Sequence, residues 1–212
     1  MHQVVEVALE GMDKNAIFNV VARKTNHVGR LASYLEVAAR EGYIARAEAN
    51  SAGQPKVVHH GSREASIGTE PHGVALPCGD DPPLMYDAST AVIVEGNCNV
   101  LRMAQLPLPA QMLLDGEGRP TTDPTVLYHL DKNQRGGILP LGLLEQGYRG
   151  SGHAIMISAA TGILSQTGFG QTGRGVNGVS FQLTDVAAFL DYQQYIDCLL
   201  YTSDAADDTP CV

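Results

Sequence analysis

The pattern of the first fifty residues most limits what this chain can fold into. Apolar residues recur at helical spacing in residues 1–16 and again in residues 29–41, where Gly42 follows as a helix-ending residue. The segments FNVVARK (18–24) and YIARAEA (43–49) are short and typical of strands. This succession of helix, strand, helix and strand predicts an α/β fold.

Later segments extend the same pattern. The strand candidates are LMYDAST (84–90) and NGVSFQL (177–183), and the helix candidates are residues 152–164 and residues 185–197. Thr184 is in the position of an N-cap for the last helix. Residues 50–83 are rich in Gly, Pro, Ser and His, which predicts a long connection across the surface or across a site.

Composition excludes several classes of protein. The net charge of −9 over 212 residues argues against a nucleic-acid-binding surface, which requires a basic face. No window approaches the roughly 20 apolar residues of a membrane span, so we expect no membrane partner. The N-terminus carries acidic residues and lacks the layout of a signal peptide. These features predict a cytoplasmic protein.

Cysteine and histidine spacing offers no metal motif. The four cysteines form no C-x-x-C pair, and none has a histidine at metal-ligand spacing, so we expect free cytosolic thiols. His59 and His60 are adjacent, and on an extended segment they would point to opposite faces. The sequence therefore predicts no metal site.

The segment GFGQTG (168–173) matches the G-x-G-x-x-G pattern of dinucleotide-binding folds. That pattern requires a strand before it and a helix after it. Here a helix candidate precedes it and a loop leading into a strand follows, so we interpret it as a Gly-rich loop. A strand leading directly into Gly168 would restore the alternative, a Rossmann dehydrogenase.

Seven segments in order resemble the malate/L-lactate dehydrogenase family of the non-Rossmann type. They are TNHVGRLASYLEVAAREG (25–42), IGTEPHGVALP (67–77), YDAST (86–90), LLDGEGRPTTDP (113–124), GILPLG (137–142), GYRGSG (147–152) and NGVSFQL (177–183). The resemblance implies a distinct α/β fold, with a mixed sheet and flanking helices. It also implies hydride transfer between NAD or NADP and a 2-hydroxy acid or 2-oxo acid, in an enzyme that forms a homodimer.

The resemblance makes His27 the candidate catalytic residue. His27 lies between a predicted strand and a predicted helix. Oxidation of a secondary alcohol needs a base for the hydroxyl proton, and histidine titrates near neutral pH. Spacing alone favours a histidine in a loop or at a helix cap, and the resemblance reverses that preference.

The candidate cofactor-binding residues come from three segments. Asp87, Ser89 and Thr90 end a strand, where they could hold ribose or phosphate or could cap a helix. Ser51 matches a position that contacts the cofactor in the family, and a turn serine is the alternative.

A second group of candidates departs from the family pattern. Arg149 stands where the family has Lys, and Gly150 beside it would let the backbone approach the ligand closely. Glu70 replaces Asn in the family's Gly-Thr-Asn-Pro turn, and its charge would be unfavourable if it faced an anionic ligand.

Both ends of the chain differ from the family pattern. The family's N-terminal helical region with a Ser-His-Gly motif has no counterpart here, and CLLYTSDAADD (198–208) reads like translated adapter sequence. We therefore expect residues 1–197 to be a partial dehydrogenase core and residues 198–212 to be a non-native tail. Such a fragment would be weakly active or inactive, and the alternative is a non-catalytic or degenerate protein that reuses the fold.

Overall fold

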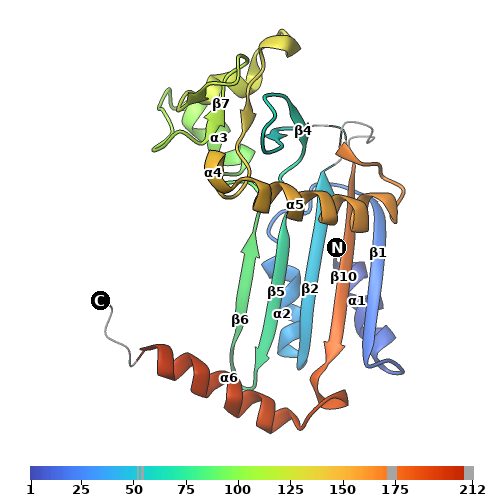
Figure 1. Ribbon diagram of the computed structural model, residues 1–212. Helices are drawn as coiled ribbons and strands as arrows, with labels where there is room; N and C mark the ends of the chain where they lie inside the picture. Colours follow the sequence, from blue (N-terminus) through green and yellow to red (C-terminus); the bar gives the residue numbers. More distant parts are fainter. Residues whose placement is uncertain (52, 54, 171–175, 208–212) are drawn as a thin grey trace.

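The computed structural model describes residues 1–51, 53, 55–170 and 176–207. It contains two five-stranded sheets, with the larger sheet below the smaller one in the view of Figure 1. The strands of the larger sheet, in spatial order, are β1 (Ile17–Thr25), β10 (Asn177–Asp185), β2 (Tyr43–Ser51), β5 (His72–Cys78) and β6 (Asp81–Ala88). The strands of the smaller sheet, in spatial order, are β4 (Ala65–Ile67), β3 (Val57–Val58), β9 (Gly137–Ile138), β7 (Leu113–Leu114) and β8 (Pro120–Thr121).

Helical segments surround both sheets. The α-helices are α1 (His2–Met12), α2 (Ala32–Arg40), α3 (Glu95–Met103), α4 (Leu143–Gln146), α5 (Tyr148–Ile157) and α6 (Tyr192–Asp207). A π-helical segment, η3 (Ser158–Ile163), continues α5, and the 3-10 turns are η1 (Pro124–Tyr128), η2 (Lys132–Gln134) and η5 (Val186–Ala188). Within the described residues, no helix is long and apolar enough to cross a lipid bilayer.

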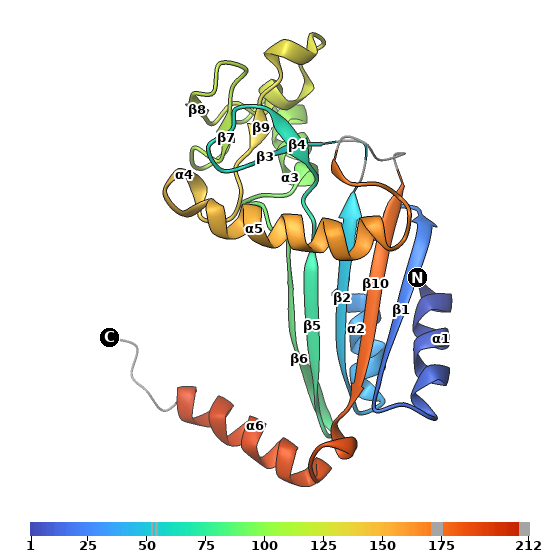
Figure 2. The same cartoon turned by 45° about the vertical axis from the view of Figure 1, so that its right-hand side comes forward.

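Buried side chains recur at every second position of the central strands, so one face of the larger sheet is apolar and is covered by helices. Ala45, Ala47 and Ala49 of β2 are buried, as are Val179, Phe181 and Leu183 of β10, and all of them pack in the core with α1 and α2. The small residues let α2 lie close to the sheet, and a Cβ on Gly73 would come within 2.6 Å of Leu35. Figure 2 shows α1 and α2 on one face of the sheet and α5 on the other.

The sheet brings together strands that are far apart in the sequence. All four of its pairings are antiparallel, and β10 lies between β1 and β2, with Phe181 opposite both Val20 and Ala47. Every second strand therefore runs in the same direction, so β1, β2 and β6 all end at the edge that faces the smaller sheet (Figure 1). The smaller sheet includes a parallel pair, β3 with β9.

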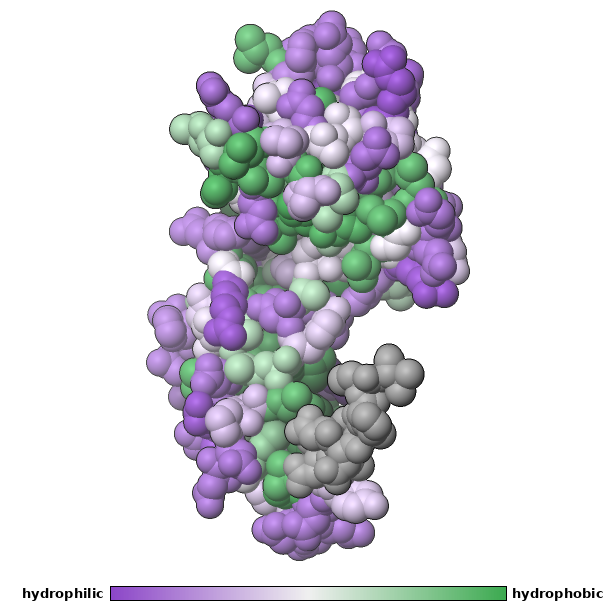
Figure 3. Space-filling view, turned by 90° about the vertical axis from the view of Figure 1, so that its left-hand side faces the viewer, coloured by the Kyte–Doolittle hydropathy of each residue, from purple (hydrophilic) through white to green (hydrophobic). Residues whose placement is uncertain are grey.

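The smaller sheet has a separate core, made with α3, η1 and α5. Its buried members include Ile67, Cys98, Leu127, Ile138 and Ala154. A narrower waist joins the two parts in Figure 3, and hydrophobic residues gather on the surface of the upper part. Exposed apolar side chains there include Val100 and Met103 on α3 and Leu143 and Leu144 on α4.

The structure confirms the α/β class and corrects two predicted boundaries. Residues 50–83 are not one long connection, because they contain β5, a strand inside the larger sheet. The final helix begins at Tyr192 and not after Thr184, which pairs with Ile17 and Ile44 in the sheet. The Asp185 carboxylate instead accepts a hydrogen bond from Ala187 N and caps the 3-10 turn η5.

Helix α6 also contains the first part of the segment expected to be a non-native tail. Residues 198–207 continue the helix, whereas residues 208–212 lie outside the described part of the chain. Ile196 is buried and contacts the turn after β5 near Gly79. The proposed division between residues 1–197 and 198–212 stays a prediction.

Candidate active site

A cavity of about 640 Å³ lies at the edge where β1, β2 and β6 end. Four residues singled out from the sequence line it: His27 after β1, Ser51 at the end of β2, and Asp87 and Ser89 at the end of β6. They converge because these three strands run in the same direction. The volume is within the range of roughly 300–1,000 Å³ typical of small-molecule and cofactor pockets.

His27 lies in the loop between β1 and α2. The neighbouring Val28 is buried, and its carbonyl accepts a hydrogen bond of 3.1 Å from the Tyr34 hydroxyl of α2. Gly29 has a φ of +75°, which turns the chain into the helix. The His27 side chain is exposed, and among the described residues no hydrogen bond holds its ring. The imidazole can therefore exchange a proton with a ligand in the cavity.

Asp87 connects β6 to the start of α2. One of its carboxylate oxygens accepts a hydrogen bond of 2.9 Å from the backbone N–H of Ala32. A carboxylate is favourable there because the first N–H groups of a helix lack internal partners and carry partial positive charge. The predicted cap of the helix after β6 is not formed, because the N-cap residue of α3 is Val94, and Asp87 instead binds the first turn of α2 from outside the helix. The residue still borders the cavity.

Ser89 and Thr90 are adjacent but differ in their surroundings. The Ser89 hydroxyl donates to Ala91 O at 2.8 Å and accepts from Ala91 N at 3.0 Å, which closes a tight turn beside the cavity. Thr90 is buried, and its hydroxyl donates to Thr69 O at 3.0 Å. Thr90 is absent from the residues that line the cavity.

Arg149 and Gly150 lie on α5, away from the lining of this cavity. The Arg149 guanidinium lies over the Tyr148 ring at 5.8 Å. Gly150 is buried where α5 crosses the chain, and a Cβ there would come within 2.6 Å of Thr90 O. The close approach that Gly150 permits is therefore between segments of the protein, and a cofactor contact by either residue stays a prediction.

Glu70 lies beneath the cavity and does not line it. Its side chain is buried, and Oε1 accepts hydrogen bonds from Gly68 N at 3.1 Å and Ser51 N at 3.5 Å. Burial raises the pKa of Glu70 to about 7, against the lowering effect of these two N–H groups. Oε2 and Ser158 Oγ are near each other, but neither has a hydrogen-bond partner among the described residues. The carboxyl group is therefore turned inward, and the unfavourable case of a charge that faces an anionic ligand does not arise.

Sequence reasoning missed the positive charge near the cavity. Lys56 lines it and also lines a second cavity of about 410 Å³, together with Lys132 and Arg135. The Lys56 ammonium lies 4.9 Å from the centre of the Tyr128 ring. Lys56 is far from Lys132 and Arg135 in the sequence, so no local motif connects it to them.

The described start of the segment GFGQTG, residues 168–170, is not preceded by the strand that a dinucleotide-binding turn requires. The helical segments α5 and η3, and no strand, precede Gly168, as the sequence analysis expected. The Gly168 carbonyl accepts a hydrogen bond of 3.0 Å from the Asn50 side chain. Residues 171–173 of the segment lie outside the described part of the chain. The Rossmann alternative is therefore wrong.

Comparison with known proteins identifies similar chains. A family model described as malate/L-lactate dehydrogenase matches residues 1–210. A 2,3-diketo-L-gulonate reductase from Citrobacter koseri is 35% identical over 164 residues, which are 77% of this chain and 45% of that protein. A Δ1-pyrroline-2-carboxylate/Δ1-piperideine-2-carboxylate reductase from Pseudomonas putida is 31% identical over 141 residues, 66% of this chain and 38% of that protein. The chain thus spans less than half the length of these curated relatives.

The fold matches solved structures over its whole length. Malate dehydrogenase from Entamoeba histolytica superimposes with a TM-score of 0.90 at 20% identity, covering 99% of this chain and 61% of that one. At this identity the likeness concerns the fold alone.

Proposed function

This chain belongs to the malate/L-lactate dehydrogenase family, and on that premise we propose that it is the partial core of an oxidoreductase. The reaction is hydride transfer between a nicotinamide cofactor, NAD or NADP, and a 2-hydroxy acid or its 2-oxo form. The observation that carries the proposal is the shared cavity, which unites His27, Ser51, Asp87 and Ser89 from three separate segments.

In this proposal His27 is the acid and base of the reaction. Its exposed ring borders the cavity, where it would take the hydroxyl proton of a 2-hydroxy acid and return it to the carbonyl oxygen in the reverse direction. The bound nicotinamide ring would supply or accept the hydride. Ser51 and Ser89 would offer hydroxyl groups to the ribose, and Asp87 would keep the His27 loop in place through its bond to Ala32.

Positive charge supports an anionic cofactor. Lys56 borders both cavities, so a molecule that extends from one to the other would pass its ammonium group. Lys132 and Arg135 add two cations to the second cavity, against one acid, Glu64. This arrangement suits a diphosphate, because lysine and arginine are the usual partners of phosphate oxygens.

Cofactor binding is the first test. We expect titration of NADH or NADPH with the full chain to show saturable binding by fluorescence. Gly96 lines the cavity, and nothing lies within 4 Å of a Cβ placed there, so Gly96→Trp should fill the space and abolish binding without disturbing the fold. Gly152→Trp is the matched control, because Gly152 on α5 also has open space around it but lies outside the cavity.

Hydride transfer is the second test. We expect weak NADH or NADPH oxidation with a panel of 2-oxo acids, and His27→Gln should lower its kcat by about 10²-fold or more while leaving cofactor affinity unchanged. His129→Gln is the control, since His129 is exposed near η2. Absence of cofactor binding would contradict the proposal for this chain and favour a non-catalytic protein with the same fold. The homodimer expected for the full-length enzyme stays a prediction.

A further inference from the structure

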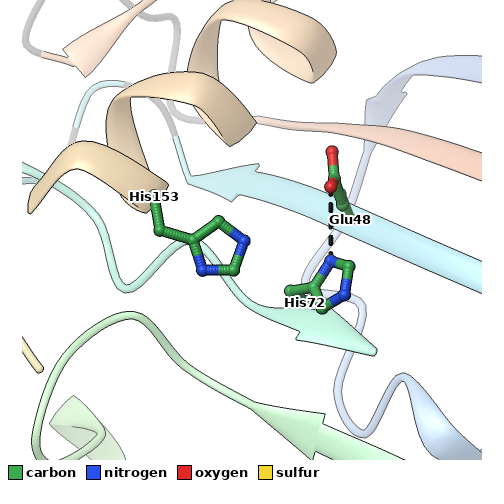
Figure 4. A group of neighbouring side chains, drawn as sticks. All are labelled: Glu48, His72 and His153. Carbon is green, nitrogen blue, oxygen red and sulfur yellow. Dashed lines mark hydrogen bonds and ion pairs between the residues drawn. The ribbon is translucent and has the colours of Figure 1, made fainter. Parts of the chain in front are cut away.

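Three side chains with metal-ligating atoms meet on the open face of the larger sheet. Glu48 on β2 and His72 on β5 are directly opposite each other in the antiparallel pair, and His153 reaches toward them from α5 (Figure 4). One ligand atom from each residue can be chosen so that all three lie within 4.8 Å of one another. None of the three lines the cavity that contains His27.

We propose that Glu48, His72 and His153 bind a divalent transition-metal ion such as Zn²⁺. Two imidazoles and one carboxylate form a donor set that suits Zn²⁺ and its neighbours, and a site with three protein ligands leaves a position for water. Residues close together in the chain offer no metal motif, whereas these three ligands come from three separate elements.

The distances between the three ligand atoms are close to those that a bound ion requires. Zn–N and Zn–O bonds of about 2.0–2.1 Å place tetrahedral ligand atoms roughly 3.3 Å apart. Glu48 Oε1 and His72 Nδ1 form a hydrogen bond of 3.2 Å, whose proton a bound ion would replace, and the ring centroids of His72 and His153 are 5.2 Å apart. His153 is the exposed member, so a small rotation of its side chain can close the remaining gap.

The surroundings give an ion access and favour the ligating form of His153. A cavity of about 350 Å³ on this face is lined by Glu48 and His72, together with Arg46 and Gln182. Burial and the nearby His72 lower the pKa of His153, against the opposing influence of Glu48, and this lowering favours the neutral ring. A neutral imidazole has the lone pair that a metal requires.

An ion at this site would join α5 to the middle of the larger sheet. It would link β2, β5 and α5, and α5 also packs in the core of the smaller sheet through Ala154. Because the folded state alone brings the three ligands together, binding should stabilise the fold. At a Zn²⁺ concentration 100 times the Kd, we expect Tm to rise by on the order of 5 °C.

The test is calorimetric titration of the full chain, first stripped with a chelator, with ZnCl₂ at pH 7.5. We expect one ion per chain, and His153→Ala and Glu48→Gln should each weaken binding by at least about tenfold. His129→Ala is the matched control, because it removes an exposed imidazole from the other part of the molecule and should change the Kd less than twofold. MgCl₂ should not compete, because Mg²⁺ prefers oxygen ligands.

A second readout separates loss of a ligand from loss of the fold. Each variant should keep the Tm of the metal-free parent within a few degrees, because His153 is exposed and Glu48 is only partly buried. The ligand-field spectrum of the Co²⁺-loaded parent should disappear or change in His153→Ala. Absence of stoichiometric binding, or equal Zn²⁺ affinity in the parent and in folded His153→Ala, would overturn the proposal.

Discussion

The buried carboxyl of Glu70 should make the protein less stable as the pH rises. In the folded state its pKa is about 7, whereas the ordinary value is 4.5, so between these values the folded chain holds a proton that the unfolded chain has released. Stability therefore falls from pH 4.5 to pH 7, and the loss remains above pH 7. A difference of 2.5 pKa units corresponds to about 3 kcal/mol at 1.36 kcal/mol per unit.

Glu70→Gln should remove this loss. Glutamine keeps an oxygen that can accept from Gly68 N and Ser51 N, and its amide nitrogen can donate to the unpartnered Ser158 Oγ. At pH 8 we expect the variant to be more stable than the parent by about 2–3 kcal/mol, or roughly 5–10 °C in Tm. At pH 4.5 the advantage should shrink to about 0.4 kcal/mol, since Glu70 is then protonated in the folded state and half protonated in the unfolded state.

Urea denaturation followed by circular dichroism, at pH 4.5 and at pH 8, measures both free energies of unfolding. Glu10→Gln is the control, because Glu10 is exposed on α1 and its neutralisation should change stability little at either pH. If Glu70→Gln is no more stable than the parent at pH 8, or if its advantage is the same at both pH values, then burial does not keep the carboxyl protonated.

Three further predictions concern packing, capping and thiol reactivity. Gly150→Ala should cost about 1–3 kcal/mol in unfolding free energy because the new Cβ meets Thr90 O, whereas Gly152→Ala on the same helix meets nothing and should be neutral or slightly stabilising. Asp87→Ala should cost about 1–2 kcal/mol in unfolding free energy, measured by urea denaturation, through loss of the hydrogen bond to Ala32 N at the start of α2. Burial and the neighbouring Glu95 raise the pKa of Cys98 to about 11. A thiol reagent at pH 8 should therefore modify the exposed Cys198 much faster than Cys98, and equal rates would contradict the burial of Cys98.

Local sequence pattern predicted the elements that have regular periodicity. Strand β10 alternates buried and partly buried residues as expected, and Gly42 follows α2 with a φ of +91°. Strand β5 was missed because Gly73 and Pro77 interrupt its pattern. Gly73 is required by a tertiary contact, because it makes room for Leu35 of α2. No local signal in the sequence therefore marks this segment as a strand.

The candidate site was only partly predictable, because most of its residues are positioned by contacts between segments that are far apart in the sequence. Resemblance identified His27 and Ser51, and the common direction of β1 and β2 explains why they meet. The burial of Thr90, the inward turn of Glu70 and the position of Arg149 on α5 depend on contacts between distant segments. No spacing within the sequence encodes those contacts.

The placement of β10 between β1 and β2 has a consequence for how the chain acquires its fold. Val20 and Ala47 do not pair with each other. Each of them pairs with Phe181, which is synthesised more than a hundred residues later. A nascent chain with β1 and β2 alone would present two unpaired strand edges beside the apolar faces of α1 and α2. Closing such long loops is slow, so folding should begin only after β10 has left the ribosome, and until then these edges need protection from aggregation.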